Sequence, residues 1–110
     1  MFWAELAPRS GSEQSGRRPV IVISHDGFNE SIRWQSVIVV PISTSSSQAR
    51  RGPTAVSLPP GTGGLKQESV GLCHQITTLD RSKLSQKIGE IDHATLNRIE
   101  AGIKAATGML

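Results

Sequence analysis

The sequence predicts a small, mainly β protein: a strongly bent sheet or barrel with one C-terminal helix packed across it. Short runs of β-branched residues, bounded by turn-forming residues, recur over residues 1–91 and indicate five or six strands. Only the segment after residue 91 repeats its apolar residues at helical spacing. The 110 residues, 36% of them hydrophobic, supply one small core, so we expect residues 1–110 to form a single domain.

The first half of the chain holds three of the expected strands. Residues 2–6 (FWAEL) form the first strand, and residues 20–23 (VIVI) form a second that is buried on both faces. Residues 25–32 contain Gly27 and Asn29 and read as a turn or one helical turn. The third strand spans residues 37–42, where Pro41 marks a bulge or an edge position because proline donates no hydrogen bond to a ladder.

The second half begins with residues 44–54, which have no apolar residue except Ala49 and are expected to be mobile. The remaining expected elements are a short strand at 55–58, a loop at 59–64, one long strand at 69–78 and a last short strand at 87–91. Alternation along the long strand places His74 on the face of Val70, Leu72 and Ile76.

The C-terminal helix has a start signal, an apolar stripe and a stop signal. Asp92 is the expected N-cap, and Gly108 is placed to end the helix. The stripe expected to face the sheet consists of Leu96, Ile99, Ile103, Ala106 and Leu110.

The net charge is +3, and six of the eight arginines, but no lysine, lie within residues 1–54. The planar fork of arginine suits phosphate, so their pairing in Gly- and Ser-rich segments favours a phosphate-bearing partner. Selection for solubility is the alternative explanation.

The cysteine and histidine content argues against a metal or another cofactor. Cys73 is the single cysteine, which excludes an internal disulfide, and the three histidines have no ligand spacing among themselves or with it. The chain has no apolar run long enough to span a bilayer and no secretory leader pattern, so we expect a soluble, cytoplasmic protein.

Arg18 is the first candidate for a functional residue. It stands between the polar loop 11–17 and the buried strand, and Pro19 keeps its backbone extended. An arginine at the mouth of a rigid strand can hold a phosphate in a defined geometry. The alternative is structural: Arg18 pairs with Glu13 and ties the loop down.

The chain resembles the MazF/PemK family of toxin ribonucleases from type II toxin–antitoxin modules. The segments that carry the resemblance are GSEQSGRRPVIVIS (11–24), VIVVPIST (37–44), ESVGLCHQITTLDRSKL (68–84) and KIGEI (87–91). The resemblance implies an SH3-like β-barrel with a C-terminal helix, a homodimer, and metal-independent cleavage of single-stranded mRNA that inhibits translation. It also implies a cognate antitoxin whose disordered tail occupies the RNA groove, and operator DNA bound only by the toxin–antitoxin complex.

The resemblance also implies the site residues. Arg18 and Ser43 form its catalytic core, and the RNA-binding residues expected around them are Ser12, Glu13, Gln14, Thr44, Arg50, Arg51 and Gln75. Arg50 and Arg51 contact phosphate or form a solvated tether. The chain departs from the family at Leu72 and Thr77, where relatives carry arginine, and at His74, where many carry an acidic residue.

The chemistry of RNA cleavage fits these residues. In a metal-free reaction the 2′-hydroxyl attacks its own phosphate, giving a cyclic phosphate and a free 5′-hydroxyl. Arg18 and a hydroxyl from Ser43 or Thr44 can stabilise the charge that develops, but arginine stays protonated and is no general base. His74 is the candidate base, because imidazole titrates near neutral pH; it alternatively lines the groove without titrating, which leaves Glu13 or a water. The rival to an active toxin is a non-catalytic module that binds antitoxin and operator DNA.

Overall fold

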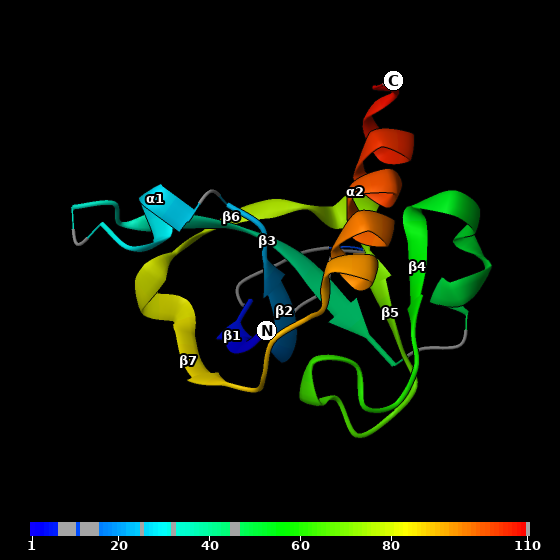
Figure 1. Cartoon of the computed structure of the whole chain (residues 1–110), viewed down its shortest axis with the longest axis horizontal. Helices are drawn as coiled ribbons and strands as arrows, with labels where there is room; N and C mark the ends of the chain where they lie inside the picture. Colours follow the sequence, from blue (N-terminus) through cyan, green and yellow to red (C-terminus); the bar gives the residue numbers. More distant parts are fainter. Residues whose placement is uncertain (7–10, 12–15, 25, 32, 45–46, 110) are drawn as a thin grey trace.

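The computed structural model describes residues 1–6, 11, 16–24, 26–31, 33–44 and 47–109. Within them, seven strands form one antiparallel sheet, and a helix follows near the C-terminus (Figure 1). The strands are β1 (Phe2–Glu5), β2 (Arg17–Val22), β3 (Ser36–Ser43), β4 (Ala55–Leu58), β5 (Ser69–Leu72), β6 (Thr77–Asp80) and β7 (Leu84–Lys87). The α-helices are α1 (Asp26–Asn29) and α2 (His93–Thr107), and the 3₁₀ turns are η1 (Gln48–Thr54), η2 (Thr62–Gly64), η3 (Cys73–Gln75) and η4 (Arg81–Lys83).

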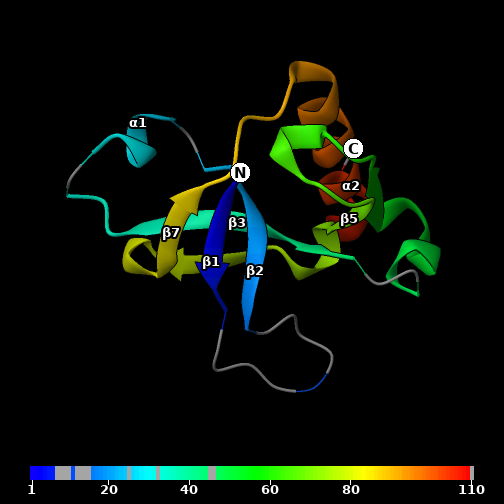
Figure 2. The same cartoon turned by 90° about the horizontal axis from the view of Figure 1, so that it is seen from below.

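The sheet runs in the order β4-β5-β3-β2-β1-β7, with β6 paired to β3 outside this path. Figure 2 shows β7, β1 and β2 side by side, with β3 crossing behind them. In the same view α1 and α2 lie on opposite sides of these strands. The expected fold class, mainly β with a C-terminal helix, is confirmed. Closure of the sheet into a barrel stays a prediction.

β3 pairs with β2 along one side and with two different strands, β6 and β5, along the other. Val39 pairs with Thr77 of β6, and Ile42 pairs with Gly71 of β5. Between these positions β3 advances three residues while the opposite chain uses six, so Cys73–Gln75 arches out of the sheet as η3. The single strand expected over 69–78 is therefore wrong. Pro41, which has no N–H to donate, lies in the gap between the two ladders; its predicted edge position is wrong, since β3 is central.

Two apolar clusters lie on the two faces of β2 and β3. Val20 and Val39 belong to one, and Ile21 and Val40 to the other, as expected for strands buried on both faces. The cluster towards α2 contains Met1, Ile21, Val40, Ile42, Val56, Leu58, Leu65, Cys73 and Ile99; the other contains Ala4, Leu6, Val20, Val37, Val39 and Leu79.

Both ends of α2 are as predicted, but its buried face is displaced. The Asp92 carboxylate accepts the N–H of Thr95 at 2.7 Å, and Gly108 ends the helix at φ +72°. The residues buried on α2 are Thr95, Ile99 and Gly102, with Ile103 beside them. Leu96 is 39% exposed and Ala106 is also exposed, whereas Gly102 lies so close to Cys73 and Val56 that a β-carbon there would meet both. Leu110 lies outside the described residues.

Three further expectations need correction. β2 begins at Arg17 rather than after Pro19, because residues 17–19 pair with β1. The last strand is Leu84–Lys87 rather than 87–91. Residues 48–54 form η1, which consists of two short 3₁₀ turns on either side of a kink at Gly52, where φ is +78°. A segment without regular structure was expected there. The strands at the N-terminus and at 55–58 and the single helical turn at Asp26–Asn29 are confirmed.

Candidate nucleic-acid interface

A groove of about 680 Å³ lies where β1, β2 and the ends of β3 and β7 meet the loop at residues 64–67. Its lining residues are Trp3, Arg17, Arg18, Pro19, Thr44, Gly64, Leu65, Lys66, Gln67, Gln86, Lys87 and Ile88. Four of these are cations, and among the described lining residues none is a carboxylate. Phosphate is the kind of group such a surface attracts.

Arg18 reaches this groove from an exposed position on β2. Its backbone pairs with Ala4 of β1, and Pro19 pairs with Trp3, so the arginine stands on a strand held by the next strand of the sheet. This is the rigid mounting that the sequence predicted. Glu13, its proposed structural partner, lies outside the described residues.

Ser43 ends β3, and Thr44 follows it and lines the groove together with Arg18. The β2–β3 ladder pairs Val20 with Pro41, and continuing that register by two residues sets Ser43 across from Arg18. Ser43 is only 4% exposed, whereas Thr44 is exposed and lines the groove. Arg18 and Thr44 thus meet at the groove, with the Ser43 side chain buried beside them.

Arg17, which the sequence analysis did not single out, is also in the groove. Its guanidinium carbon lies 4.4 Å from the centroid of the Trp3 ring. Cross-strand register brings the two together, because Trp3 pairs with Pro19 and Glu5 with Arg17. Its position next to Arg18 in the sequence was the one available sign of a role in the groove. The strand register that brings it over Trp3 could not be predicted from the sequence.

His74 does not belong to the described lining of the groove. It stands exposed on η3, beside Gln75, whose amide nitrogen lies 3.5 Å from the imidazole Nε2. η3 lies against the middle of β3 and under α2, whereas Thr44 follows the far end of β3. His74 thus lies on a turn between the two strands that pair with β3, whereas Thr44 lies beyond the end of β3.

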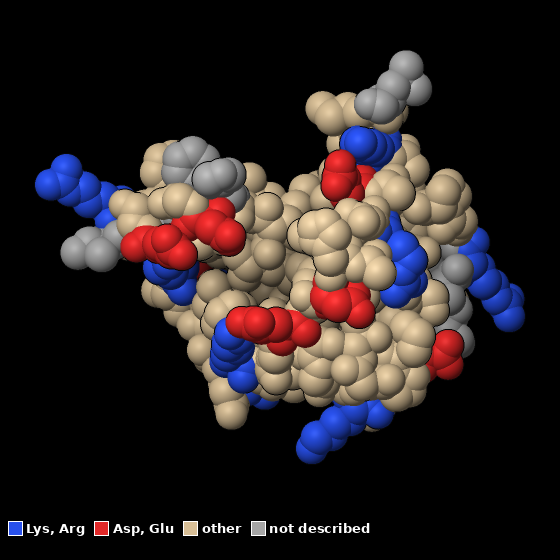
Figure 3. All heavy atoms as spheres, in the orientation of Figure 1, with Lys and Arg blue, Asp and Glu red and all other residues tan. Residues whose placement is uncertain are grey.

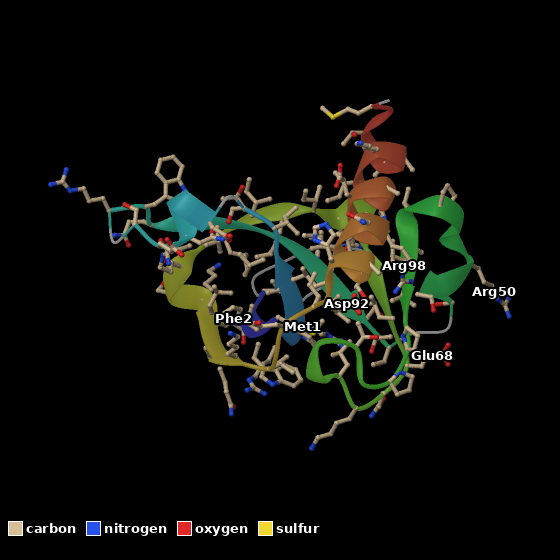
Figure 4. All side chains as sticks on the ribbon, viewed as in Figure 1. Met1, Phe2, Arg50, Glu68, Asp92 and Arg98 are labelled. Atoms are coloured by element: carbon tan, nitrogen blue, oxygen red, sulfur yellow. The ribbon has the colours of Figure 1, made fainter. Side chains whose placement is uncertain are left out.

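The other expected RNA-binding residues are scattered or outside the described part. Ser12, Glu13 and Gln14 lie outside the described residues, as does the side chain of Arg51. Arg50, on η1, projects away from the body of the molecule on the other side of α2 from Met1 and Phe2 (Figure 4). It is not part of the described groove lining.

Two of the positions where the chain departs from the family that it resembles, Leu72 and Thr77, lie within strands of the sheet. Leu72 is fully buried at the end of β5, and Thr77 is half-buried at the start of β6.

Cys73 is also fully buried. Its thiol donates a weak hydrogen bond to the carbonyl of Ile99 at 3.6 Å, and burial raises the pKa of that thiol to about 11. A protonated, inaccessible thiol is not a nucleophile.

A second cavity, of about 480 Å³, has a different electrostatic character. It is lined on the α1 side by Asp26 and Arg81 and on the β7 side by Lys87 and Glu90. Figure 3 shows this hollow between α1 and α2, with acidic side chains gathered beside it. Its mixed charge suits an RNA backbone less well than the groove does.

Within the described part of the chain, no three His, Cys, Asp or Glu side chains are grouped so as to hold a metal ion. No helix among the described residues is long and apolar enough to cross a membrane.

Comparison with known families decides the relationship. Residues 1–107 match the family model described as PemK-like, MazF-like toxin of type II toxin–antitoxin system. The chain belongs to this family. Endoribonuclease MazF6 of Mycobacterium tuberculosis is 35% identical over 104 residues, 94% of this chain and 90% of that protein. Endoribonuclease EndoA of Bacillus subtilis is 31% identical over 110 residues, covering 100% of this chain and 92% of that protein.

Solved structures agree. MazF from Deinococcus radiodurans superposes with a TM-score of 0.79 at 26% identity, covering 98% of this chain and 92% of that one. A MazE–MazF structure from the same organism superposes with a TM-score of 0.71 at 26% identity, covering 99% and 92%. The chain is thus a MazF-like endoribonuclease toxin with the MazF-like fold.

Proposed function

We propose that this MazF-like toxin binds single-stranded mRNA in the groove and cleaves it there without a metal, which inhibits translation. The observation that carries the proposal is the lining of the groove: four cations, Arg17, Arg18, Lys66 and Lys87, line it together with Thr44, and no carboxylate lies among the described lining residues. Of the four, Lys87 is ion-paired with Glu90 at 2.8 Å. This surface attracts a phosphate backbone and presents the donors that metal-free cleavage needs.

In the proposed reaction, the 2′-hydroxyl attacks the adjacent phosphorus, the bond to the 5′-oxygen breaks, and a 2′,3′-cyclic phosphate forms. Arg18 stabilises the charge on the phosphorane and hydrogen-bonds the leaving 5′-oxygen, which takes up a proton from the protonated base or from water. The hydroxyl of Ser43, which the continued register sets across from Arg18, is the second donor, and Thr44 contacts the RNA. Each such donor is worth about 10²–10³-fold in rate.

The general base is the part of the mechanism with several candidates. His74 is our first proposal because imidazole titrates near neutral pH. Because His74 is not among the described lining residues of the groove, it would act only if the substrate or a second copy of the chain brings it to the reacting phosphate. Glu13 and a bound water are the alternatives.

RNA contacts outside the reacting centre extend the proposed interface. Gln75 lies beside His74, and Arg50 is exposed on η1, so both are available to a strand that runs past η3. The remaining proposed contacts are Ser12, Glu13, Gln14 and Arg51.

The proposed partners are a cognate antitoxin, a second copy of this chain and, for the toxin–antitoxin complex alone, operator DNA. The MazE–MazF structure at 26% identity supports the antitoxin. An acidic, disordered antitoxin tail would compete with RNA for the groove cations. Because mRNA is the proposed substrate, we place the toxin in the cytoplasm.

The experiment incubates the purified protein with a long single-stranded RNA in the presence of EDTA. Fragments with 5′-hydroxyl ends and 2′,3′-cyclic phosphates are expected. Intact RNA under these conditions, with operator binding by the antitoxin complex, would instead identify a non-catalytic module. Cleavage that EDTA abolishes would overturn the metal-independent mechanism.

A further inference from the structure

Arg17 and Trp3 form a stacked pair inside the groove. The guanidinium carbon lies 4.4 Å from the indole centroid, and both residues line the same cavity as Arg18 and Thr44. Trp3 is held in β1 by its pairing with Pro19, so the platform under the arginine is fixed by the sheet.

The contact with Trp3 determines which hydrogen-bond donors Arg17 presents to a ligand. The guanidinium lies over the indole ring, and this contact restrains the group without using any of its N–H donors. The five donors lie in the plane of the guanidinium and are directed outwards from its edges. A flat fork held in this way is suited to a ligand with two adjacent acceptors.

We propose that Arg17, held flat on Trp3, is a specificity-determining residue that recognises an unpaired guanine of the RNA beside the cleaved phosphate. Guanine presents its O6 and N7 acceptors side by side, and a bidentate arginine contact to them is the commonest specific contact to that base. In an unpaired strand the base is free to be turned towards such a group. The inference rests on the proposed function and names the sequence preference of the same site.

The residues around Arg17 and Trp3 favour a base, rather than a second phosphate, as the ligand of Arg17. Arg18 and Lys66 already provide phosphate-binding charge in the groove, and phosphate requires no fixed plane. The amide side chains of Gln67 and Gln86 also line the groove, and amides carry the paired donors and acceptors that base edges use. The groove therefore combines backbone-binding charge with groups that read a base.

The test measures cleavage of a single-stranded RNA library with a randomised segment, in EDTA, and sequences the 5′-hydroxyl ends. The wild type is expected to favour guanine at one position near the cut by roughly 5- to 150-fold. Arg17→Lys keeps the charge but loses the fork, so this ratio should fall towards one. Trp3→Leu should lower it as well, and Trp3→Phe should preserve most of it. Arg33→Lys, an exposed arginine in the turn before β3, is the matched control and should retain the ratio.

Three results would overturn the inference while leaving the proposed function standing. The first is a wild type without a guanine preference, and the second is an Arg17→Lys variant with the wild-type ratio. The third is an Arg17→Ala variant whose cleavage rate falls by the same factor for every sequence, with the rate restored in Arg17→Lys. The last would make Arg17 a phosphate contact. A wild type that cleaves no RNA would overturn the proposed function itself, and this inference with it.

Discussion

Gly102 of α2 packs directly on Cys73 of η3. A β-carbon at Gly102 would lie 2.6 Å from the Cys73 Sγ and 2.9 Å from a methyl carbon of Val56. Alanine in a helix is favoured over glycine by about 1 kcal/mol, but overpacking a filled core costs about 1–3 kcal/mol. We therefore expect Gly102→Ala to lower the free energy of unfolding by about 1 kcal/mol.

Denaturant titration of the variant measures this loss, and a double-mutant cycle assigns it. Cys73→Ala removes the Sγ, so Gly102→Ala should cost less in that background than in the wild type. A Gly102→Ala variant as stable as the wild type would show that α2 moves away from η3 without cost.

The N-cap of α2 predicts a pH dependence of stability. Hydrogen bonds from the side chain and the backbone N–H of Thr95 lower the pKa of the Asp92 carboxyl. A carboxyl whose pKa is lower in the folded state contributes fully above its unfolded pKa, and the contribution is lost as the pH falls through the folded value. The wild type should therefore lose stability more steeply than Asp92→Asn below about pH 4, where an unfolded aspartate begins to protonate. Thermal melts between pH 6 and pH 2 measure both slopes; parallel curves would contradict the cap.

The proposal that His74 is the general base predicts the pH profile of cleavage. The rate should rise with pH as a neutral imidazole becomes available, and His74→Ala should flatten that rise and slow cleavage by about 10²–10⁴-fold. His74→Asp should keep measurable activity with the transition moved to lower pH. His93→Ala, at the exposed start of α2, is the control. A His74→Ala variant with the wild-type profile would leave Glu13 or a water as the base.

An acidic antitoxin peptide should compete with RNA for the groove. Binding of both ligands should weaken as salt rises, and Arg18→Ala should reduce the salt dependence of RNA binding by about one phosphate contact, or a slope near 0.7. Fluorescence anisotropy with labelled RNA and unlabelled peptide measures the competition. Simultaneous binding of the two without mutual interference would show that they use different surfaces.

The sequence predicted the features that depend on local patterns. The β-branched runs, the cap at Asp92 and the αL stop at Gly108 are local, and each was found. The family resemblance paired Arg18 with Ser43 and set Thr44 beside them. In the structure Arg18 and Thr44 line one groove, whereas Ser43 is buried at the end of β3 and is not among the described lining residues.

The features that were missed depend on partners distant in the chain. The break at Cys73–Gln75 follows from how β3 changes partners on either side of Pro41, which alternation within residues 69–78 cannot reveal. α2 approaches η3 closely at Gly102, a residue that the predicted apolar stripe left out because glycine carries no apolar side chain. The stacking of Arg17 on Trp3 depends on the register between β1 and β2.

The central claim is that Arg18 stabilises the transition state of RNA cleavage, and Arg18→Ala tests it most directly. The side chain is exposed and the apolar run begins only at Val20, so the variant should fold; its circular dichroism spectrum and melting temperature check this. Single-turnover cleavage of a single-stranded RNA in EDTA should slow by ~10²-fold or more, while the control Arg33→Ala should cleave at the wild-type rate. A folded Arg18→Ala protein that cleaves RNA as fast as the wild type would contradict the account.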